Sequence, residues 1–330
     1  MQREILSRNV KKETDEHYRD RWPFAADARR NLYLKYANNI PKEIAESRGD
    51  PFFEREPRDM WAEVAQNIME RLGETAGKVG LDVGSSSGYF AHQLFNRGYK
   101  GRLLGIDIEM ETQHAVEAII KRDHPDADFY LGVSDAQHLR ELTHIDEYDR
   151  QLKVNIPKDH FDFVTELFVM YHVPSTRRAY TAAHRVVKPD GLVVFSGRGE
   201  ENQKHLWTLG RVVADELNLM RPESFYEVHS LDDMEEYLNR SPCYEVLEKV
   251  PQAEHLWIPN SEEGWLDFKW ALLTLPYGRN RSTGKNIRGL ELEKYISEYI
   301  RPQFEKQAVA NGGYFIDYVF QNYYVCRAVK

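Results

Sequence analysis

The chain has 330 residues with 44 Lys and Arg against 53 Asp and Glu, a formal net charge of −9, and its 42% apolar and 12% aromatic content is that of a folded globular protein. An acidic chain lacks the basic surface that binding nucleic acid through its phosphates requires, and two cysteines cannot form a disulfide framework, so we expect no nucleic-acid partner and a reducing, cytoplasmic location. The first residues carry no apolar targeting segment, and no uncharged apolar run approaches about 18 residues, so we expect neither a secretory signal nor a membrane span.

The first 59 residues contain many charged and many aromatic side chains. They have too little continuous apolar surface to fold alone. Apolar side chains fall near helical spacing at Leu32, Tyr36 and Ile40, and prolines and a glycine follow them. We therefore predict an N-terminal helical cap over residues 1–59 that lies on another part of the protein.

From residue 60 to about residue 200, apolar extended segments alternate with amphipathic helical ones. The pattern predicts strands at residues 78–83, 101–107, 128–133, 161–165 and 192–196, with helices from residue 60 and at 89–97, 112–122 and 175–187. The segment between the third and fourth of these strands is predicted to be a loop or a short helix. The alternation predicts βαβ crossovers and a parallel sheet buried on both faces, which binds ligands beyond the carboxyl ends of its strands.

The last third of the chain is less regular. A helix is predicted after Ser230, residues 244–250 alternate as a half-buried strand does, and a second strand pattern covers 316–328. Between these strands, residues 251–313 form a long aromatic insert of the kind that usually serves as a lid or a binding element. We therefore expect a core of residues 60–250 and 314–330 and a lid or substrate insert at 251–313.

A loop of small residues, Gly84-Ser85-Ser86-Ser87-Gly88, joins the first predicted strand to a helix. Small residues let the backbone approach a ligand, and the start of a helix offers unpaired N–H groups. The dinucleotide fingerprint G-x-G-x-x-G is broken here, because position 86 is serine. By itself the loop is weak evidence, since a glycine pair after a strand is about as often mere turn geometry.

Three acidic residues stand at the carboxyl ends of three successive predicted strands: Asp82, Asp107 and Asp135. Each alone is most simply a solvated or capping residue, but together they suit a ligand with a cation, a ribose diol and an exocyclic amine. No lysine is placed to cradle a phosphate, and an acid beside the loop would repel a pyrophosphate. The set therefore predicts a cationic nucleoside as the ligand.

These segments together make the chain similar to the class I S-adenosylmethionine-dependent methyltransferases of the small-molecule type. The matching text recurs in the family's order as LDVGSSSGYF at 81–90, LGID at 104–107, SDA at 134–136, FDFVTELFVMYHVP at 161–174 and RVVKPDGLVVFS at 185–196. The resemblance covers residues 60–200 and the two closing strands. It implies an α/β, Rossmann-like fold with a mostly parallel seven-stranded sheet, an antiparallel last strand, the N-terminal helical cap and a helical insert between the last two strands.

The resemblance also implies which residues bind S-adenosyl-L-methionine. Asp82 and the glycine loop would surround the methionine part, Asp107 would bind the ribose, and Asp135 would border the adenine. The full set of cofactor residues that we expect is Tyr18, Asp82, Gly84, Ser85, Ser86, Gly88, Asp107, Ile108, Asp135, Ala136, Glu166 and Leu167. Tyr18 belongs to it only if the N-terminal segment folds over the cofactor. The family often has glycine where Ser86 stands.

Three residues after the fourth strand are the catalytic candidates. His172 is the natural general base if the acceptor must lose a proton, and its packing under the lid is the competing explanation. Tyr171 would orient the acceptor, where the family often has histidine, and Glu166 would bind a cationic group or cap the strand. The histidines of the chain show no metal-ligand spacing, so we expect no metal.

These residues predict an enzyme that methylates a small-molecule acceptor in an aromatic pocket under a lid, as a monomer or a homodimer. One alternative keeps the cofactor but uses its own amine to displace methylthioadenosine. A second alternative, methylation of RNA or protein, is disfavoured by the net charge. A nicotinamide enzyme is disfavoured by the broken fingerprint and by Asp135, and a non-catalytic nucleotide-binding module is disfavoured by the predicted lid.

Overall fold

The computed structural model describes residues 32, 35–37, 58–108, 113–145, 150–170, 173–199, 204–219, 231–273 and 289–330. The chain divides into two compact units, and each is described here by itself. The core unit comprises Asp59–Gly199, His229–Pro251 and Gln321–Lys330, and the second unit comprises Met1–Arg58, Glu200–Val228 and Gln252–Phe320. Most of the predicted N-terminal cap therefore lies outside the described residues.

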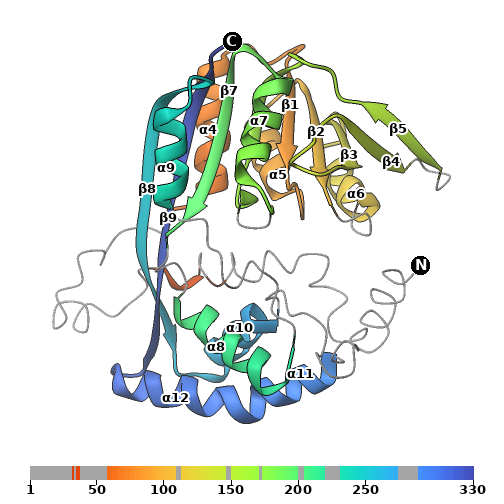
Figure 1. The fold of residues 1–330 in the computed structure, drawn as a ribbon. Helices are drawn as coiled ribbons and strands as arrows, with labels where there is room; N and C mark the ends of the chain where they lie inside the picture. Colours follow the sequence, from red (N-terminus) through yellow and green to blue (C-terminus); the bar gives the residue numbers. More distant parts are fainter. Residues whose placement is uncertain are drawn as a thin grey trace. The chain divides into compact units, whose positions relative to one another are not determined.

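Nine strands form one sheet, in the order β5-β4-β3-β2-β1-β6-β7-β9-β8 (Figure 1). Their bounds are β1 Val79–Val83, β2 Arg102–Asp107, β3 Asp128–Val133, β4 Glu141–Ile145, β5 Gln151–Asn155, β6 Phe161–Glu166, β7 Val187–Arg198, β8 Tyr244–Pro259 and β9 Tyr314–Ala328. The five central strands β3, β2, β1, β6 and β7 pair in parallel, and β9 runs antiparallel to β7. The mostly parallel sheet with an antiparallel last strand is thus confirmed.

The predicted number of seven strands is wrong, because the segment expected to be a loop or short helix forms the antiparallel hairpin β4–β5. Every residue of β5 is exposed. A short edge strand without a buried face shows no clear alternation of apolar and polar residues, which is why the sequence pattern did not indicate it.

Helices cover both faces of the sheet in the core unit (Figure 1). Their bounds are α4 Met60–Leu72, α5 Tyr89–Asn96, α6 Gln113–Asp123, α7 Thr176–Val186 and α9 Leu231–Arg240. On one face, alternate strand residues such as Leu81, Ile106 and Val164 join α7 and α9 in a single apolar cluster. On the other face the rings of Phe95 and Phe129 meet, with centroids 6.2 Å apart, because α5 packs there. The strands are therefore apolar on both sides, as a buried parallel sheet requires.

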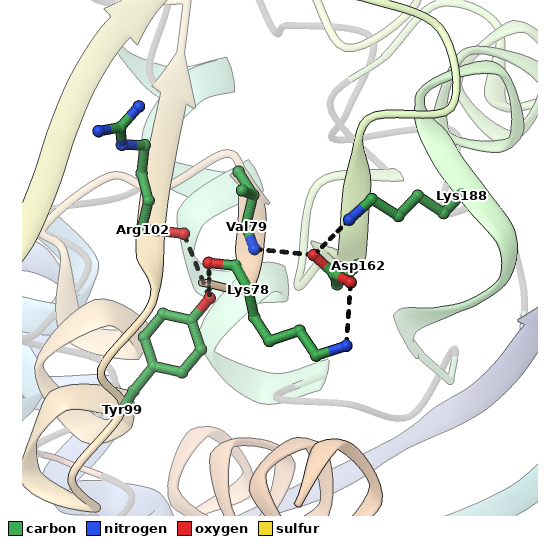
Figure 2. A network of polar contacts seen from close by, with 6 residues as sticks. All are labelled: Lys78, Val79, Tyr99, Arg102, Asp162 and Lys188. Carbon is green, nitrogen blue, oxygen red and sulfur yellow. Dashed lines mark hydrogen bonds and ion pairs between the residues drawn. The ribbon is translucent and has the colours of Figure 1, made fainter. Parts of the chain in front are cut away.

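A polar network fastens the amino ends of the central strands (Figure 2). Asp162 at the start of β6 accepts hydrogen bonds from the backbone N–H of Val79 at 2.9 Å, from Lys188 at 2.8 Å and from Lys78 at 3.3 Å. Partial burial alone would raise the pKa of Asp162, but these contacts outweigh it and lower the pKa. The Tyr99 hydroxyl lies 3.2 Å from the carbonyl oxygens of both Lys78 and Arg102. The starts of β1, β2 and β6 are thereby held in register.

The second unit contains the helical insert between β8 and β9. The insert contains α10 Glu262–Leu273, α11 Gly289–Tyr295, the π-helical segment Ile296–Ile300 and α12 Arg301–Ala310. The unit also contains α8 Lys204–Glu216, which precedes β8 in the chain. Rings of the insert are buried in the unit's own apolar cluster, where Phe268 and Phe304 each lie within about 5 Å of Phe315 between centroids. Phe268 and Phe304 therefore serve packing within the unit, and the aromatic substrate pocket expected of the insert stays a prediction.

Candidate active site

The small-residue loop turns sharply between β1 and α5 and is folded back onto β2. The backbone N–H groups of Gly84 and Ser85 both donate to the Ile106 carbonyl, at 2.8 and 2.9 Å. Gly84 has a φ of +73°, and a Cβ there would lie 2.3 Å from a methyl group of Val169. Both the backbone conformation and the close approach therefore require glycine at position 84.

Ser86 stands where the family often has glycine, and it adopts a φ of +44°, in the left-handed region that non-glycine residues seldom occupy. Its backbone N–H donates to Asp107 Oδ2 at 2.9 Å, and the Ile108 N–H donates to Asp107 Oδ1 at 2.7 Å. The carboxylate of Asp107 is thus clamped between the glycine loop and the end of β2. Ile108, beside it, leaves 65% of its surface exposed, so the surroundings of Asp107 are open on that side.

Asp82 lies on the opposite face of the sheet from Glu166. Asp82 is in register with Thr165, whose hydroxyl donates to Asp82 Oδ1 at 2.7 Å. The second oxygen, Oδ2, is buried and accepts no hydrogen bond within the described part of the chain. Burial raises the pKa of Asp82 to about 7, against the effect of the Thr165 hydroxyl. A buried carboxyl oxygen without a partner is costly, and a bound cationic group would satisfy it.

Glu166 ends β6, in register with Val83 of β1, and its side chain points to the face that α7 and α9 cover. It is fully buried, and neither carboxyl oxygen has a hydrogen-bond partner among the described residues. Burial raises its pKa to about 8, so the carboxyl is protonated at neutral pH. In this form it is closed from solvent, and its assignment as a cofactor or catalytic residue stays a prediction.

Asp135 follows β3 and closes its own turn. Although partial burial acts the other way, hydrogen bonds from the Gln137 backbone at 2.8 Å and the His138 ring at 2.9 Å lower the pKa of Asp135 and keep it ionised. The neighbouring Ala136 is buried, and the Ser134 N–H donates to the Asp107 carbonyl at 3.0 Å. This turn is therefore tied to the end of β2, which brings Asp135 and Asp107 to the same edge of the sheet.

The loop after β6 contains residues that the sequence did not single out for the site. Phe168 adopts a φ of +60°, and its backbone N–H donates to the Ser196 hydroxyl at 2.8 Å. Its ring lies 5.0 Å from that of Trp61, which in turn lies 5.9 Å from that of Tyr89. Thr165 could have been found from its register with Asp82, but no sequence pattern indicated Phe168.

The structure therefore brings together the glycine loop, Asp82, Asp107 and the Asp135 turn at the carboxyl ends of β1, β2 and β3, with Leu167 buried in the loop after β6. Tyr18, Tyr171 and His172 lie outside the described residues.

In the part of the chain that the structure describes, no group of three or more His, Cys, Asp and Glu side chains could hold a metal ion. No helix in the described ranges combines the length and the apolar character needed to cross a membrane.

Comparisons with known proteins identify the family. A family model described as "Methyltransferase domain" matches residues 55–238, more than half of the chain. The chain is 27% identical over 177 residues to a ubiquinone biosynthesis O-methyltransferase of Citrobacter koseri, covering 52% of this chain and 63% of that protein. It is 30% identical over 166 residues to the Acinetobacter baumannii protein of the same name, covering 49% of this chain and 60% of that protein. The match thus spans about three fifths of the length of these relatives.

A solved structure shows the same fold. The crystal structure titled a putative methyltransferase from Bacillus halodurans aligns with a TM-score of 0.51 at 14% identity, covering 81% of this chain and 100% of that chain. Family model and fold agree with the glycine loop and the acids at the strand ends. The chain therefore belongs to the methyltransferase-domain family, in agreement with its resemblance to the class I S-adenosylmethionine-dependent methyltransferases.

Proposed function

We propose that the chain binds S-adenosylmethionine at the edge formed by the glycine loop, Asp82, Asp107 and the Asp135 turn, and transfers its methyl group to an oxygen of a small-molecule acceptor. The observation that carries the proposal is the pair of carboxylates beside the loop. Asp107 is fixed by two backbone N–H groups, and Asp82 keeps a buried oxygen without a partner. Oxygen as the methylated atom is inferred from the names of the relatives, which are O-methyltransferases.

The residues present fit this cofactor, which when bound supplies an electrophilic methyl group on a sulfonium. Asp107 would accept hydrogen bonds from the ribose diol, since the N–H groups of Ser86 and Ile108 fix the orientation of its carboxylate. Asp82 Oδ2 is as buried as the Glu166 carboxyl, so it would accept from the ammonium group only where cofactor binding uncovers it, and that contact would lower the pKa that burial has raised. Ala136 would supply apolar contact to the adenine.

The remaining chemistry is orientation and, for an alcohol or phenol acceptor, loss of a proton. Holding the reacting groups in line can be worth about 7–11 kcal/mol, so positioning by the site accounts for much of the expected rate. His172 is our proposed base and Tyr171 our proposed orienting residue. Glu166 would contact the reaction only if the packing on the face covered by α7 and α9 opened, because its side chain is fully buried.

The test is calorimetric titration of S-adenosylmethionine into the wild-type chain and into Asp107→Asn. Hydrogen bonds to a charged group are worth about 1.5–3 kcal/mol, so the variant should bind at least about tenfold more weakly. Asp126→Asn is the matched control, because Asp126 is an exposed residue of the turn before β3. Equal affinity of all three proteins would remove the assignment of the cofactor site.

A second measurement addresses the reaction itself. Mass spectrometry after incubation with cofactor and a phenolic acceptor should show S-adenosylhomocysteine together with the methylated acceptor. Methylthioadenosine in place of S-adenosylhomocysteine would instead show that the cofactor is cyclised, and it would replace the proposed transfer while leaving the binding site intact.

A further inference from the structure

The connection from β3 to β6 differs from an ordinary βαβ crossover. β3 and β6 are parallel strands of one sheet with β2 and β1 between them, and such strands are usually joined through a helix that covers the sheet. In the described residues 134–145 and 150–160 the chain forms no helix and builds the hairpin β4–β5 instead. The sheet face over the first residues of β2 and β3 is therefore not covered by a crossover helix.

The hairpin diverges from the sheet soon after it begins. β4 pairs with β3 through Val133 and Thr143. Two residues earlier on β3, side chains bind the backbone of Leu131: Glu117 accepts from its N–H at 2.6 Å, and the His144 ring contacts its carbonyl oxygen at 2.8 Å. At Leu131 the backbone of β3 is thus satisfied by side chains and not by the backbone of β4.

A groove of about 260 Å³ lies in this opening. Its apolar wall is formed by Leu104, Leu142, Ile156 and Phe161, of which the last three are almost fully buried. Among the described residues the lining is mostly apolar. Its polar side chains are Asn155, Tyr130, His160, Arg102, which is ion-paired with Asp128, and His144, which lies 4.0 Å from Glu117. Its volume is just below the range of about 300–1,000 Å³ for drug-sized ligands, which suits a molecule of one or two rings.

Arg102, at the start of β2, supplies a cation at this groove. Its Nε donates to Asp128 at 2.8 Å, and its guanidinium carbon lies 5.9 Å from the ring centroid of Tyr130. Within the described residues its two terminal nitrogens make no hydrogen bond, and Figure 2 shows the guanidinium pointing away from the network that fixes its backbone carbonyl. Two parallel N–H groups of this kind match the two oxygens of a carboxylate.

We propose that this groove is a second ligand site, which binds a small carboxylate whose one- or two-ring apolar body enters between β3 and the hairpin while Arg102 holds the carboxylate. The site lies at the amino ends of β1, β2 and β6, whereas the cofactor residues stand at the carboxyl ends of the sheet. The proposal therefore does not depend on the identity of the acceptor or on the methyl transfer itself.

Two exposed residues of β5 give a matched test. Val154 lines the groove and Leu152 does not, although they are 46% and 45% exposed and lie two residues apart on the same strand. We would measure binding of 4-fluorobenzoate to the full chain by fluorine NMR, for wild type, Val154→Asp, Leu152→Asp and Arg102→Gln. Thermal unfolding of each variant verifies that it is folded.

The proposal expects saturable binding to wild type and to Leu152→Asp with equal affinity. Binding should weaken at least tenfold in Val154→Asp and at least fivefold in Arg102→Gln, and neutral 4-fluorobenzyl alcohol should bind wild type at least fivefold more weakly than the carboxylate does. Absence of saturable binding, or equal affinity in wild type and Val154→Asp, would overturn it. Equal weakening by Leu152→Asp would also overturn it, because the strand edge as a whole, and not the groove, would then be responsible.

Discussion

Replacing Glu166 by glutamine should make the protein markedly more stable at neutral and alkaline pH. Burial raises the pKa of this carboxyl from its ordinary 4.5 to about 8, and no described group donates a hydrogen bond to it. Between these values the unfolded chain is ionised and the folded chain is protonated, so unfolding releases a proton and stability falls as pH rises, by about 1.36 kcal/mol per pH unit. At pH 7 the wild type is then destabilised by about 3 kcal/mol. Glutamine has the same shape and does not ionise.

The assay is urea unfolding of wild type and Glu166→Gln at pH 5, 6, 7 and 8. We expect nearly equal free energies of unfolding at pH 5 and a difference that grows to several kcal/mol by pH 8. Glu141→Gln, at an exposed position of β4, should change the free energy by less than about 1 kcal/mol at every pH. Parallel pH profiles for wild type and Glu166→Gln would refute the reasoning, because they would mean that the carboxyl is ionised in the folded protein.

Three further changes test the geometry of the sheet. Gly84→Ala should destabilise the protein by about 1–3 kcal/mol, because a Cβ at that φ meets Val169; unchanged thermal unfolding would contradict this. Thr165→Val removes the hydroxyl that donates to Asp82 and should cost about 1–3 kcal/mol in urea unfolding at pH 8, but less at pH 5, where Asp82 is protonated in the folded protein. Asp162→Asn should cost about 1–2 kcal/mol at pH 7 and less at low pH, because the lowered pKa of Asp162 contributes stability that is lost as pH falls through it; a pH-independent difference would argue against its ionic contacts.

Much of the core could be predicted from the sequence, because strands buried on both faces are continuous apolar runs and glycine marks their turns. The positions of Asp82 and Asp107 at strand ends followed from the same pattern. The hairpin β4–β5 did not follow, since its pairing depends on a partner strand rather than on a buried face. The burial of Glu166 could not be predicted either, because the sequence around an acidic residue at a strand end does not indicate whether its side chain points to solvent or into the core.

The rings of the insert show a second limit. A cluster of Trp and Phe in a long insert suggests a binding pocket, but the same composition is needed to give a helical unit a core of its own. The contacts of Phe268 and Phe304 with Phe315 show that these two rings form part of the core of the helical unit. Composition reports how much apolar surface a segment carries, and only the fold decides whether a ligand or the chain itself covers it.

The place of β9 in the sheet has a consequence for how the protein is made. β9 is synthesised after the other eight strands, yet it lies between β7 and β8, and β8 joins the sheet through it. While the ribosome works through residues 244–313, the free edge of β7 is exposed and β8 has no strand to pair with. Closure of the sheet therefore follows translation of residues 314–328, and the nascent chain must keep two unpaired edges from aggregating until then.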